Sequence, residues 1–212
     1  IYYDPMLAKL ITHGKSRREA IAAMIGALDQ FCVDGVITNI PLLSQIMRHP
    51  DFARGIFSTQ FFQEEYPNGF VSASLDAKER LCVVALAATL DHYESTKRSP
   101  DQVKGMFRRN VRVQNTLYET KCWYTGFEFN VEIDLTKFLV KLKSYIPQAQ
   151  VSFELNGHPW FARIRTSNFR YQIFLAGIDS MVTVLPPEVD DLYPLMPKKK
   201  ALHQVNYILA PM

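Results

Sequence analysis

One segment constrains the fold more than any other: residues 75–97 contain an uninterrupted apolar octapeptide, LCVVALAA, between charged ends. The pattern predicts one long helix, and a helix that is apolar on every face must be buried on every face. Its apolar part is far shorter than the ~20 residues that a membrane span requires. The helix therefore has to be enclosed by other parts of a protein.

The sequence after Phe127 provides that enclosure. Apolar and polar residues alternate there, which is the pattern of half-buried strands, and Asn156-Gly157 is a hairpin-turn dipeptide. A sheet that curls around an apolar helix buries its own apolar face and removes its exposed edges. We therefore predict a long central helix inside an antiparallel β-barrel over residues 71–190. The predicted strands number about seven, near residues 111–113, 127–134, 138–146, 151–155, 160–164, 169–175 and 182–184.

The first seventy residues show a different pattern, that of a partial α/β domain. Residues 6–12 and 36–38 are predicted strands, and Ser16 with Glu19 forms the capping-box pattern of a helix. The breaker cluster Tyr66-Pro67-Asn68-Gly69 predicts the domain boundary. Residues 191–212, with three prolines and three consecutive lysines, are expected to form an extended strap. The predicted fold class is thus α+β.

Catalytic motifs are not evident in the sequence. The three cysteines, 50 and 40 residues apart, fit neither a disulfide framework nor a zinc site, and they indicate a reducing compartment. The five histidines are scattered singly and are expected at the surface or in loops, as are the carboxylates of Asp190-Asp191. Gly14-Lys15-Ser16 resembles the end of a phosphate-binding loop but lacks its first glycine. We expect no catalytic residue, no bound cofactor and no metal in this chain.

One basic stretch, FRRNVR at residues 107–112, is a candidate contact site. Arginine beside aromatic and apolar groups is typical of protein interfaces, although a solvated loop and a nucleic-acid contact are alternatives. The net charge of +3 is too small to favour nucleic acid. In an interface, replacing Phe107 or Arg109 by alanine should weaken partner binding without lowering the melting temperature. The candidate contact residues are Phe107, Arg108, Arg109, Val111 and Arg112.

Several motifs resemble the α-subunits of biotin-dependent acyl-CoA carboxylases. YYDPMLAKLITHG, SRREAI, DGVITNIPLL and STQFF with EYPNGF all lie within residues 1–70 and are similar to the last part of the biotin carboxylase domain. The YPNGF ending is most similar to the propionyl-CoA carboxylase branch, and the methylcrotonyl-CoA branch is the alternative. In residues 71–190 the resemblance lies in the plan of a barrel around a helix. LMPKKK and LAPM resemble the strap before the biotin carrier domain.

The resemblance implies that the chain is a fragment of a ligase that uses biotin, ATP and Mg²⁺ or Mn²⁺. The fragment itself would be non-catalytic and would dock biotin carboxylase onto the carboxyltransferase β-subunit. Its partners would be that β-subunit and the biotin carboxylase and biotin carrier domains, with neither nucleic acid nor membrane. Tyr3 and Asp4 would lie at the biotin carboxylase interface. The compartment would be a bacterial cytoplasm or the mitochondrial matrix.

Small β-barrels can enclose apolar ligands, so a carrier of such ligands is the alternative. The octapeptide LCVVALAA argues against it, because a helix in the centre of the barrel would occupy the space that a ligand needs.

Overall fold

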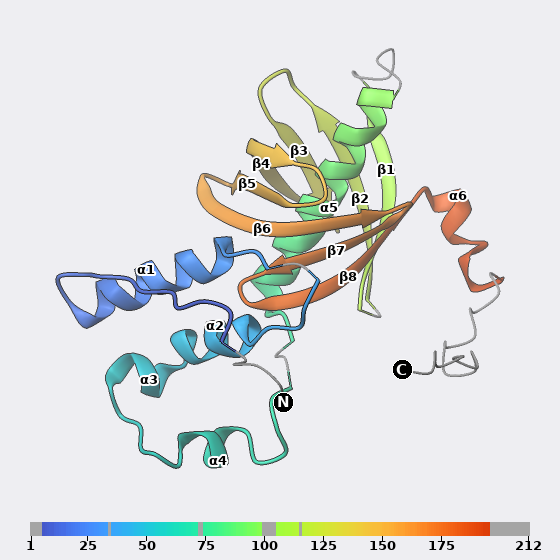
Figure 1. Cartoon of the computed structure of the whole chain (residues 1–212). Coiled ribbons are helices and arrows are strands. Elements are labelled where there is room, and N and C mark those ends of the chain that lie inside the picture. Colours follow the sequence, from blue (N-terminus) through green and yellow to red (C-terminus); the bar gives the residue numbers. More distant parts are fainter. Residues whose placement is uncertain (1–5, 34, 72–73, 99–104, 115, 196–212) are drawn as a thin grey trace, which may run out of the picture.

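The computed structural model describes residues 6–33, 35–71, 74–98, 105–114 and 116–195. Its main feature is a closed antiparallel barrel of eight strands around one long helix, and a group of short helices lies against the outer wall of the barrel (Figure 1). Within these residues no helix combines the length and the apolar character that crossing a membrane would require.

The elements follow each other in two groups. The helices before the barrel are α1 (Arg17–Gln30), α2 (Ile40–Arg48), α3 (Pro50–Arg54) and α4 (Phe61–Glu65), and the central helix is α5 (Ala77–Arg98). The strands are β1 (Phe107–Val113), β2 (Thr116–Tyr124), β3 (Phe129–Ile133), β4 (Thr136–Ile146), β5 (Gln150–Leu155), β6 (His158–Ser167), β7 (Arg170–Leu175) and β8 (Ile178–Leu185). The helix α6 (Pro187–Asp190) and the 3₁₀ helix η2 (Tyr193–Leu195) follow.

The barrel confirms the predicted fold class and corrects the number of strands. Neighbouring strands pair in chain order, and β1 pairs with β8 to close the barrel. The strand missing from the prediction is β2. Its inward positions include Thr120 and its outward positions include Leu117 and Trp123, so the alternation of apolar and polar residues is lost there. The predicted turn at Asn156-Gly157 joins β5 to β6, with positive φ at both residues.

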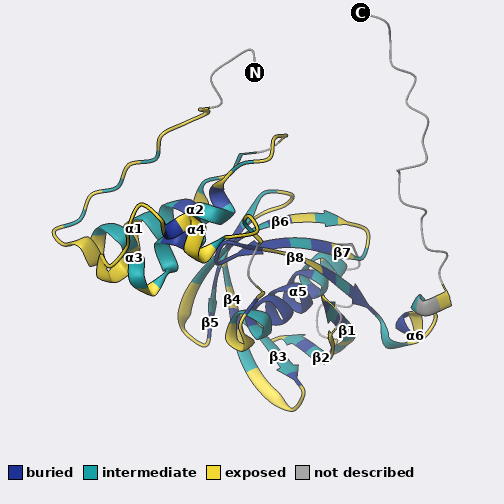
Figure 2. Cartoon of the chain, turned by 90° about the horizontal axis from the view of Figure 1, so that it is seen from below, coloured by how far each residue is buried: buried dark blue, intermediate teal, exposed yellow. Residues whose placement is uncertain are grey.

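The central helix is enclosed as its sequence requires. Every side chain from Cys82 to Leu90 has no solvent-exposed surface, and Figure 2 shows this part of α5 as buried inside the ring of strands. Ala85, Ala87 and Ala88 add little volume, which lets the strands approach the helix closely. The inner faces of all eight strands contribute to this core, among them Val111, Cys122, Val131, Val140, Phe153, Ile164, Ile173 and Val182.

We predict that Val84→Asp or Ala88→Asp abolishes folding of the barrel. An unpaired carboxylate at either position would have to be desolvated or protonated, at a cost of several kcal/mol against a total stability of ~5–15 kcal/mol. Leu135→Asp, at a position that is 87% exposed in the β3–β4 turn, is the matched control and should melt like the parent. A core variant that melts within a degree or two of the parent would contradict the enclosure of α5.

The described residues before the barrel form helices and irregular segments but no strand, which corrects the prediction for residues 6–12 and 36–38. A strand is stabilised by hydrogen bonds to a neighbouring strand, and no strand of the described chain pairs with either segment. The predicted Ser16 cap is confirmed, because the Ser16 hydroxyl accepts a hydrogen bond from the Glu19 amide, whereas the Glu19 carboxylate accepts from the Lys15 amide rather than from that of Ser16. The boundary at Tyr66–Gly69 stays a prediction.

The helices α1 and α2 are attached to the barrel by a second apolar cluster. Leu28 and Ile40 pack with Phe174 on the outer face of β7, and Arg48 of α2 forms an ion pair with Asp29 of α1, with 2.8 Å between Nη2 and Oδ2. Burial raises the pKa of Asp29 although Arg48 opposes this effect. The helices α1 and α2 are therefore packed against the outer wall of the barrel at β7.

A glycine determines how closely α2 approaches the barrel. Gly177, in the β7–β8 turn, has φ +82°, and a Cβ atom there would lie 2.5 Å from Oγ and 2.7 Å from Cβ of Ser44. Ser44 is completely buried in α2. No side chain can therefore be added at Gly177 without moving α2 away from the barrel wall.

We predict that Gly177→Ala lowers the melting temperature more than Gly157→Ala. Both positions have positive φ, so both variants carry a backbone cost of about 1–2 kcal/mol, but nothing lies within 4 Å of a Cβ at Gly157. The collision with Ser44 should add about 1–3 kcal/mol, and combining Gly177→Ala with Ser44→Gly should recover that difference. Equal melting temperatures for the two alanine variants would show that α2 does not rest on this turn.

Candidate functional site

The candidate contact residues lie on β1 rather than in a loop. Successive side chains of a strand point to opposite faces of the sheet. Phe107, Arg109 and Val111 therefore point toward α5, whereas Arg108 and Arg112 point outward; Val111 is fully buried. The five residues predicted as one contact site are thus divided between the two faces of the barrel wall.

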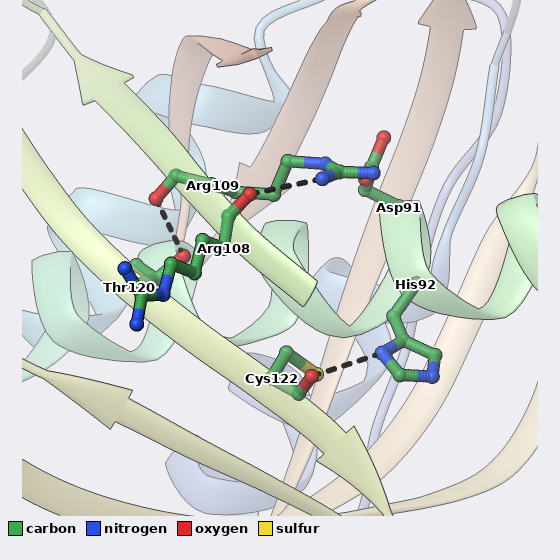
Figure 3. Close-up of polar contacts among 6 residues, drawn as sticks. All are labelled: Asp91, His92, Arg108, Arg109, Thr120 and Cys122. Carbon is green, nitrogen blue, oxygen red and sulfur yellow. Dashed lines mark hydrogen bonds and ion pairs between the residues drawn. The ribbon is translucent and has the colours of Figure 1, made fainter. Parts of the chain in front are cut away.

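Arg109 ties β1 to the central helix (Figure 3). Its Nε donates a hydrogen bond to Oδ2 of Asp91 on α5 over 2.6 Å, and its Nη1 donates to the Arg108 carbonyl over 2.9 Å. The Thr120 hydroxyl on β2 donates to the Arg109 carbonyl at 2.9 Å. The side chains of Arg109 and Asp91 are less than one-fifth exposed. This arrangement closes the barrel at the end where α5 emerges.

Phe107 packs beside a buried histidine. The ring centroids of Phe107 and His92 lie 4.2 Å apart, and Nδ1 of His92 donates to the Cys122 carbonyl over 3.1 Å. His92 has no exposed surface, so the expectation of a surface or loop histidine was wrong here. The apolar pattern of residues 81–88 predicted the buried part of α5, but the burial continues to His92 through its ring contacts and its hydrogen bond. Burial raises the pKa of the Cys122 thiol to about 12.

Arg112 forms a second ion pair, on the outside of the barrel. Its Nε and Nη2 donate to the two carboxylate oxygens of Asp190 at 2.8 and 2.7 Å, and Asn110 donates to Asp190 at 2.9 Å. Asp190 is only 3% exposed, which corrects the expectation of a solvated charge. The hydrogen bonds from Arg112 lower the pKa of the Asp190 carboxyl. These contacts attach α6 to β1.

Arg108 differs from its neighbours because its side chain is exposed. Within the described part of the chain, no ion pair or side-chain hydrogen bond involves its guanidinium. It lines two grooves of about 410 and 470 Å³ between the barrel wall and α6, and Pro187 lines both as well. Of the five predicted contact residues, Arg108 is therefore the one most available to a partner.

An aromatic surface that the sequence did not predict lies at the same end of the barrel. A cavity of about 330 Å³ is bordered by side chains of α5, β2, β3 and β4, which we call the aromatic mouth; its aromatic residues are Tyr93, Tyr124, Phe127, Phe129 and Tyr145. Phe127, in the β2–β3 loop, is 88% exposed. In the sequence Phe127 looked like the first inward residue of a strand, so its exposure could not be predicted.

Gly14-Lys15-Ser16 forms a helix cap and not a phosphate site. The Lys15 amide donates to the Glu19 carboxylate over 2.9 Å, so an acidic group occupies the place that a phosphate would take. A Cβ at Gly14 would lie 2.4 Å from the Ala20 amide nitrogen, which shows how closely this segment packs on α1. The residues present here do not fit ATP.

One group of residues in the described chain has the composition of a metal site. His49, Asp51 and Glu65 offer ligand atoms within 4.8 Å of one another. Nδ1 of His49, however, accepts a hydrogen bond from the Asp51 amide, and Arg54 forms an ion pair with the Asp51 carboxylate. These contacts cap α3 and place a positive charge beside the carboxylate. Helix capping explains His49 and Asp51, and Glu65 lies 3.4 Å from Nε2 of His49 as its ion-pair partner. Tyr3 and Asp4 lie outside the described residues.

Comparisons with known proteins match two segments of the chain to two families. Residues 1–64 match the family described as the biotin carboxylase C-terminal domain, and residues 81–199, more than half of the chain, match the propionyl-coenzyme A carboxylase BT domain. The fold and these matches define the class, a part of a biotin-dependent carboxylase. The chain belongs to the propionyl-CoA carboxylase BT domain family.

Individual relatives support the same assignment. The chain is 31% identical over its whole length to the propionyl-CoA carboxylase alpha chain of Ruegeria pomeroyi, of which it covers 32%. It is 33% identical to the human mitochondrial propionyl-CoA carboxylase alpha chain over 66% of its length, covering 21% of that protein. Biotin carboxylase 1 of Bacillus subtilis is 47% identical over 62 residues, which are 29% of this chain and 14% of that protein. The chain thus spans about a third or less of these relatives.

We predict that Arg109 and Asp91 are energetically coupled. Arg109→Met should lower the free energy of unfolding by about 1.5–3 kcal/mol, because it leaves a mostly buried carboxylate unpaired. Phe107→Ala should also lower the free energy of unfolding, because the Phe107 ring packs on His92. Both substitutions should therefore lower the melting temperature, whereas the loss of a side chain that serves only an interface would leave it unchanged.

Urea unfolding of Arg109→Met, Asp91→Asn and the double variant measures this coupling. The double variant should be more stable than the sum of the two single losses predicts, by ~0.5–3 kcal/mol. Strictly additive losses would show that the two side chains do not interact in solution.

Proposed function

We propose that this chain docks biotin carboxylase onto the carboxyltransferase β-subunit of a propionyl-CoA carboxylase and links both to the biotin carrier domain. The parent enzyme would use ATP, bicarbonate and Mg²⁺ or Mn²⁺ to carboxylate biotin, and the β-subunit would pass the carboxyl group to the acyl-CoA. This chain contributes no reacting group. Its task is to hold the parts at distances that the tethered biotin can span, which raises the effective concentration of biotin at each site to roughly millimolar.

The filled lumen of the barrel is the observation that carries this proposal. Val83, Val84 and Leu86 occupy the space in which small barrels hold a ligand, and none of them is exposed. The alternative, a carrier of apolar ligands, therefore has no central cavity to use. A barrel whose interior is closed can act only through its outer surface and its ends.

The exposed residues near the aromatic mouth support docking at that end of the barrel. Protein interfaces are enriched in aromatic residues and arginine, and the mouth combines the exposed Phe127 with an aromatic cavity. Arg108 lies on the neighbouring outer wall. Phe107 and Arg109 contribute to the same end by packing on His92 and pairing with Asp91. Of the five contact residues predicted from the sequence, the proposal keeps Arg108, and it adds Phe127 of the β2–β3 loop.

The remaining parts of the proposal follow from the family. Biotin, ATP and the metal ion belong to other domains of the parent, in keeping with the helix cap that occupies Gly14-Lys15-Ser16. The relatives come from a bacterium and from mitochondria, which supports a bacterial cytoplasm or the mitochondrial matrix as the compartment. The α-subunit of a methylcrotonyl-CoA carboxylase is the alternative parent within the same class.

We predict that Phe127→Ala and Arg108→Ala each weaken binding to a purified propionyl-CoA carboxylase β-subunit at least tenfold. A loss of about 1.4 kcal/mol is tenfold in affinity, and aromatic or arginine anchors at interfaces commonly cost more than this on truncation. Both side chains are exposed, so the melting temperature should stay unchanged.

Ile56→Ala serves as the control, because Ile56 is 65% exposed but lies in the helical part, after α3. It should bind like the parent. Titration calorimetry on the four proteins measures the affinities. Parental affinity for both barrel variants would place the contact elsewhere, and failure of the parent chain to bind the β-subunit at all would contradict the proposed function itself.

A further inference from the structure

The segment that leaves the barrel is attached to it by hydrogen bonds that reach back to the first strand. After β8 the chain passes Pro186-Pro187 and forms α6, which ends at Asp190. Both carboxylate oxygens of Asp190 accept hydrogen bonds from β1, three in all, at 2.7–2.9 Å. Bidentate arginine–carboxylate pairs fix geometry as well as adding energy. A helix of one turn is thus fastened to a strand about eighty residues earlier in the chain.

These contacts are more than the barrel requires for its own stability. The barrel is already closed by the pairing of β1 with β8, which ends at Asn110 and Leu185. Among the described side chains, the core around α5 includes none from α6 or η2. An ion pair whose arginine side chain is still 31% exposed adds only modestly to stability. Its best-attested use is to specify one arrangement among several.

We propose that Asp190, held by Arg112 and Asn110, is the anchor that fixes the point at which the chain departs from the barrel. Asp190 is a positioning residue: it determines the position and direction of the chain from Pro187 to Leu195. The guanidinium of Arg112 also lies 6.0 Å from the ring centroid of Tyr193, so η2 approaches the same arginine. The departing segment is thereby held beside β1, on the flank that carries Arg108.

The consequence for function rests on the proposed role of the chain as the link to a biotin carrier. A carrier that must reach two sites works over a limited span, and its effective concentration falls roughly as the −3/2 power of tether length once the tether exceeds that span. An anchor at Asp190 keeps the residues between Pro186 and Leu195 out of the tether. Without it, these residues would lengthen the tether and move its origin.

Arg112→Met and Asp190→Asn test the anchor directly. Arg112→Met leaves an unpaired carboxylate that regains water only by leaving the barrel wall, and Asp190→Asn removes the charge that Arg112 holds. Asp191→Asn is the matched control, because Asp191 is the exposed neighbour in the same segment. Spin labels at Leu192 and Met181, both more than half exposed, report the distance between the segment and the barrel in a Cys32→Ser background.

The parent and Asp191→Asn should give one narrow distance distribution, and both anchor variants should at least double its width while the melting temperature of the barrel changes by no more than a few degrees. An unchanged width would overturn the anchor. This measurement uses the chain alone, so its result does not depend on the proposed function.

In the assembled carboxylase, the anchor variants should lower the turnover of the complete reaction about threefold, with unchanged KM for the acyl-CoA. Bicarbonate-dependent ATP hydrolysis with free biotin should stay at the parental rate, because that half-reaction needs no tether. A broadened spin-label distance distribution together with parental turnover would overturn the positioning role of Asp190 in the reaction, while still supporting its role in attaching the segment to the barrel. If the chain supports no assembly with the β-subunit, the proposed function fails instead, whatever the spin labels report.

Discussion

The burial of α5 on all sides is the constraint on which the rest of the structure depends. A helix whose side chains from Cys82 to Leu90 all lack exposed surface can be stable only if something surrounds it completely, and a single sheet does so by closing into a barrel. Closure also removes the unpaired edges that a sheet of eight strands would otherwise present. The helix and the sheet therefore depend on each other for burial of their apolar faces. The interior that they share has no room for a ligand.

With the interior filled, the polar residues of β1 determine what the outside and the ends of the barrel can do. Because side chains alternate along a strand, Arg109 meets Asp91 of the central helix while Arg112 meets Asp190 of α6. The same strand thus holds α5 in place and fixes the segment that leaves the barrel. Among the polar residues of β1, Arg108 is the one left exposed for a partner, on the outer wall beside α6. The basic stretch is better described as a junction of three elements than as one contact surface.

The sequence predicted the elements whose periodicity is strong and missed those whose partners are distant in the chain. The apolar octapeptide and the alternation after Phe127 were sufficient for the barrel and its central helix. The two wrong predictions, for β2 and for residues 6–12, both concern pairing with strands that are distant in the chain. In β2, Thr120 points inward and Trp123 outward, so its own pattern does not indicate a strand, and its pairing with β1 and β3 compensates for this. Conversely, residues 6–12 have the apolar pattern of a strand but no partner in the described chain.

The same reasoning applies to the candidate site. The composition of residues 107–112 indicated a functional stretch, but the roles of the arginines depend on Asp91 and Asp190, 18 and 78 residues away in the chain. The exposure of Phe127 depends on the β2–β3 loop. No local pattern contains this information. The family resemblance, in contrast, was carried by contiguous motifs and was confirmed by the matches to residues 1–64 and 81–199.

Hydrogen exchange of the chain with and without the carboxyltransferase β-subunit tests most directly the central claim, that a barrel with a filled interior acts through one end. The account predicts that amides of residues 82–90 exchange only through global unfolding in both states. It also predicts that the β-subunit slows exchange in residues 105–110 and 124–129 and leaves exchange unchanged in the turns at residues 155–158 and 175–178, which lie at the opposite end of the barrel. Fast exchange in the middle of α5, or protection confined to other surfaces of the barrel, would contradict it.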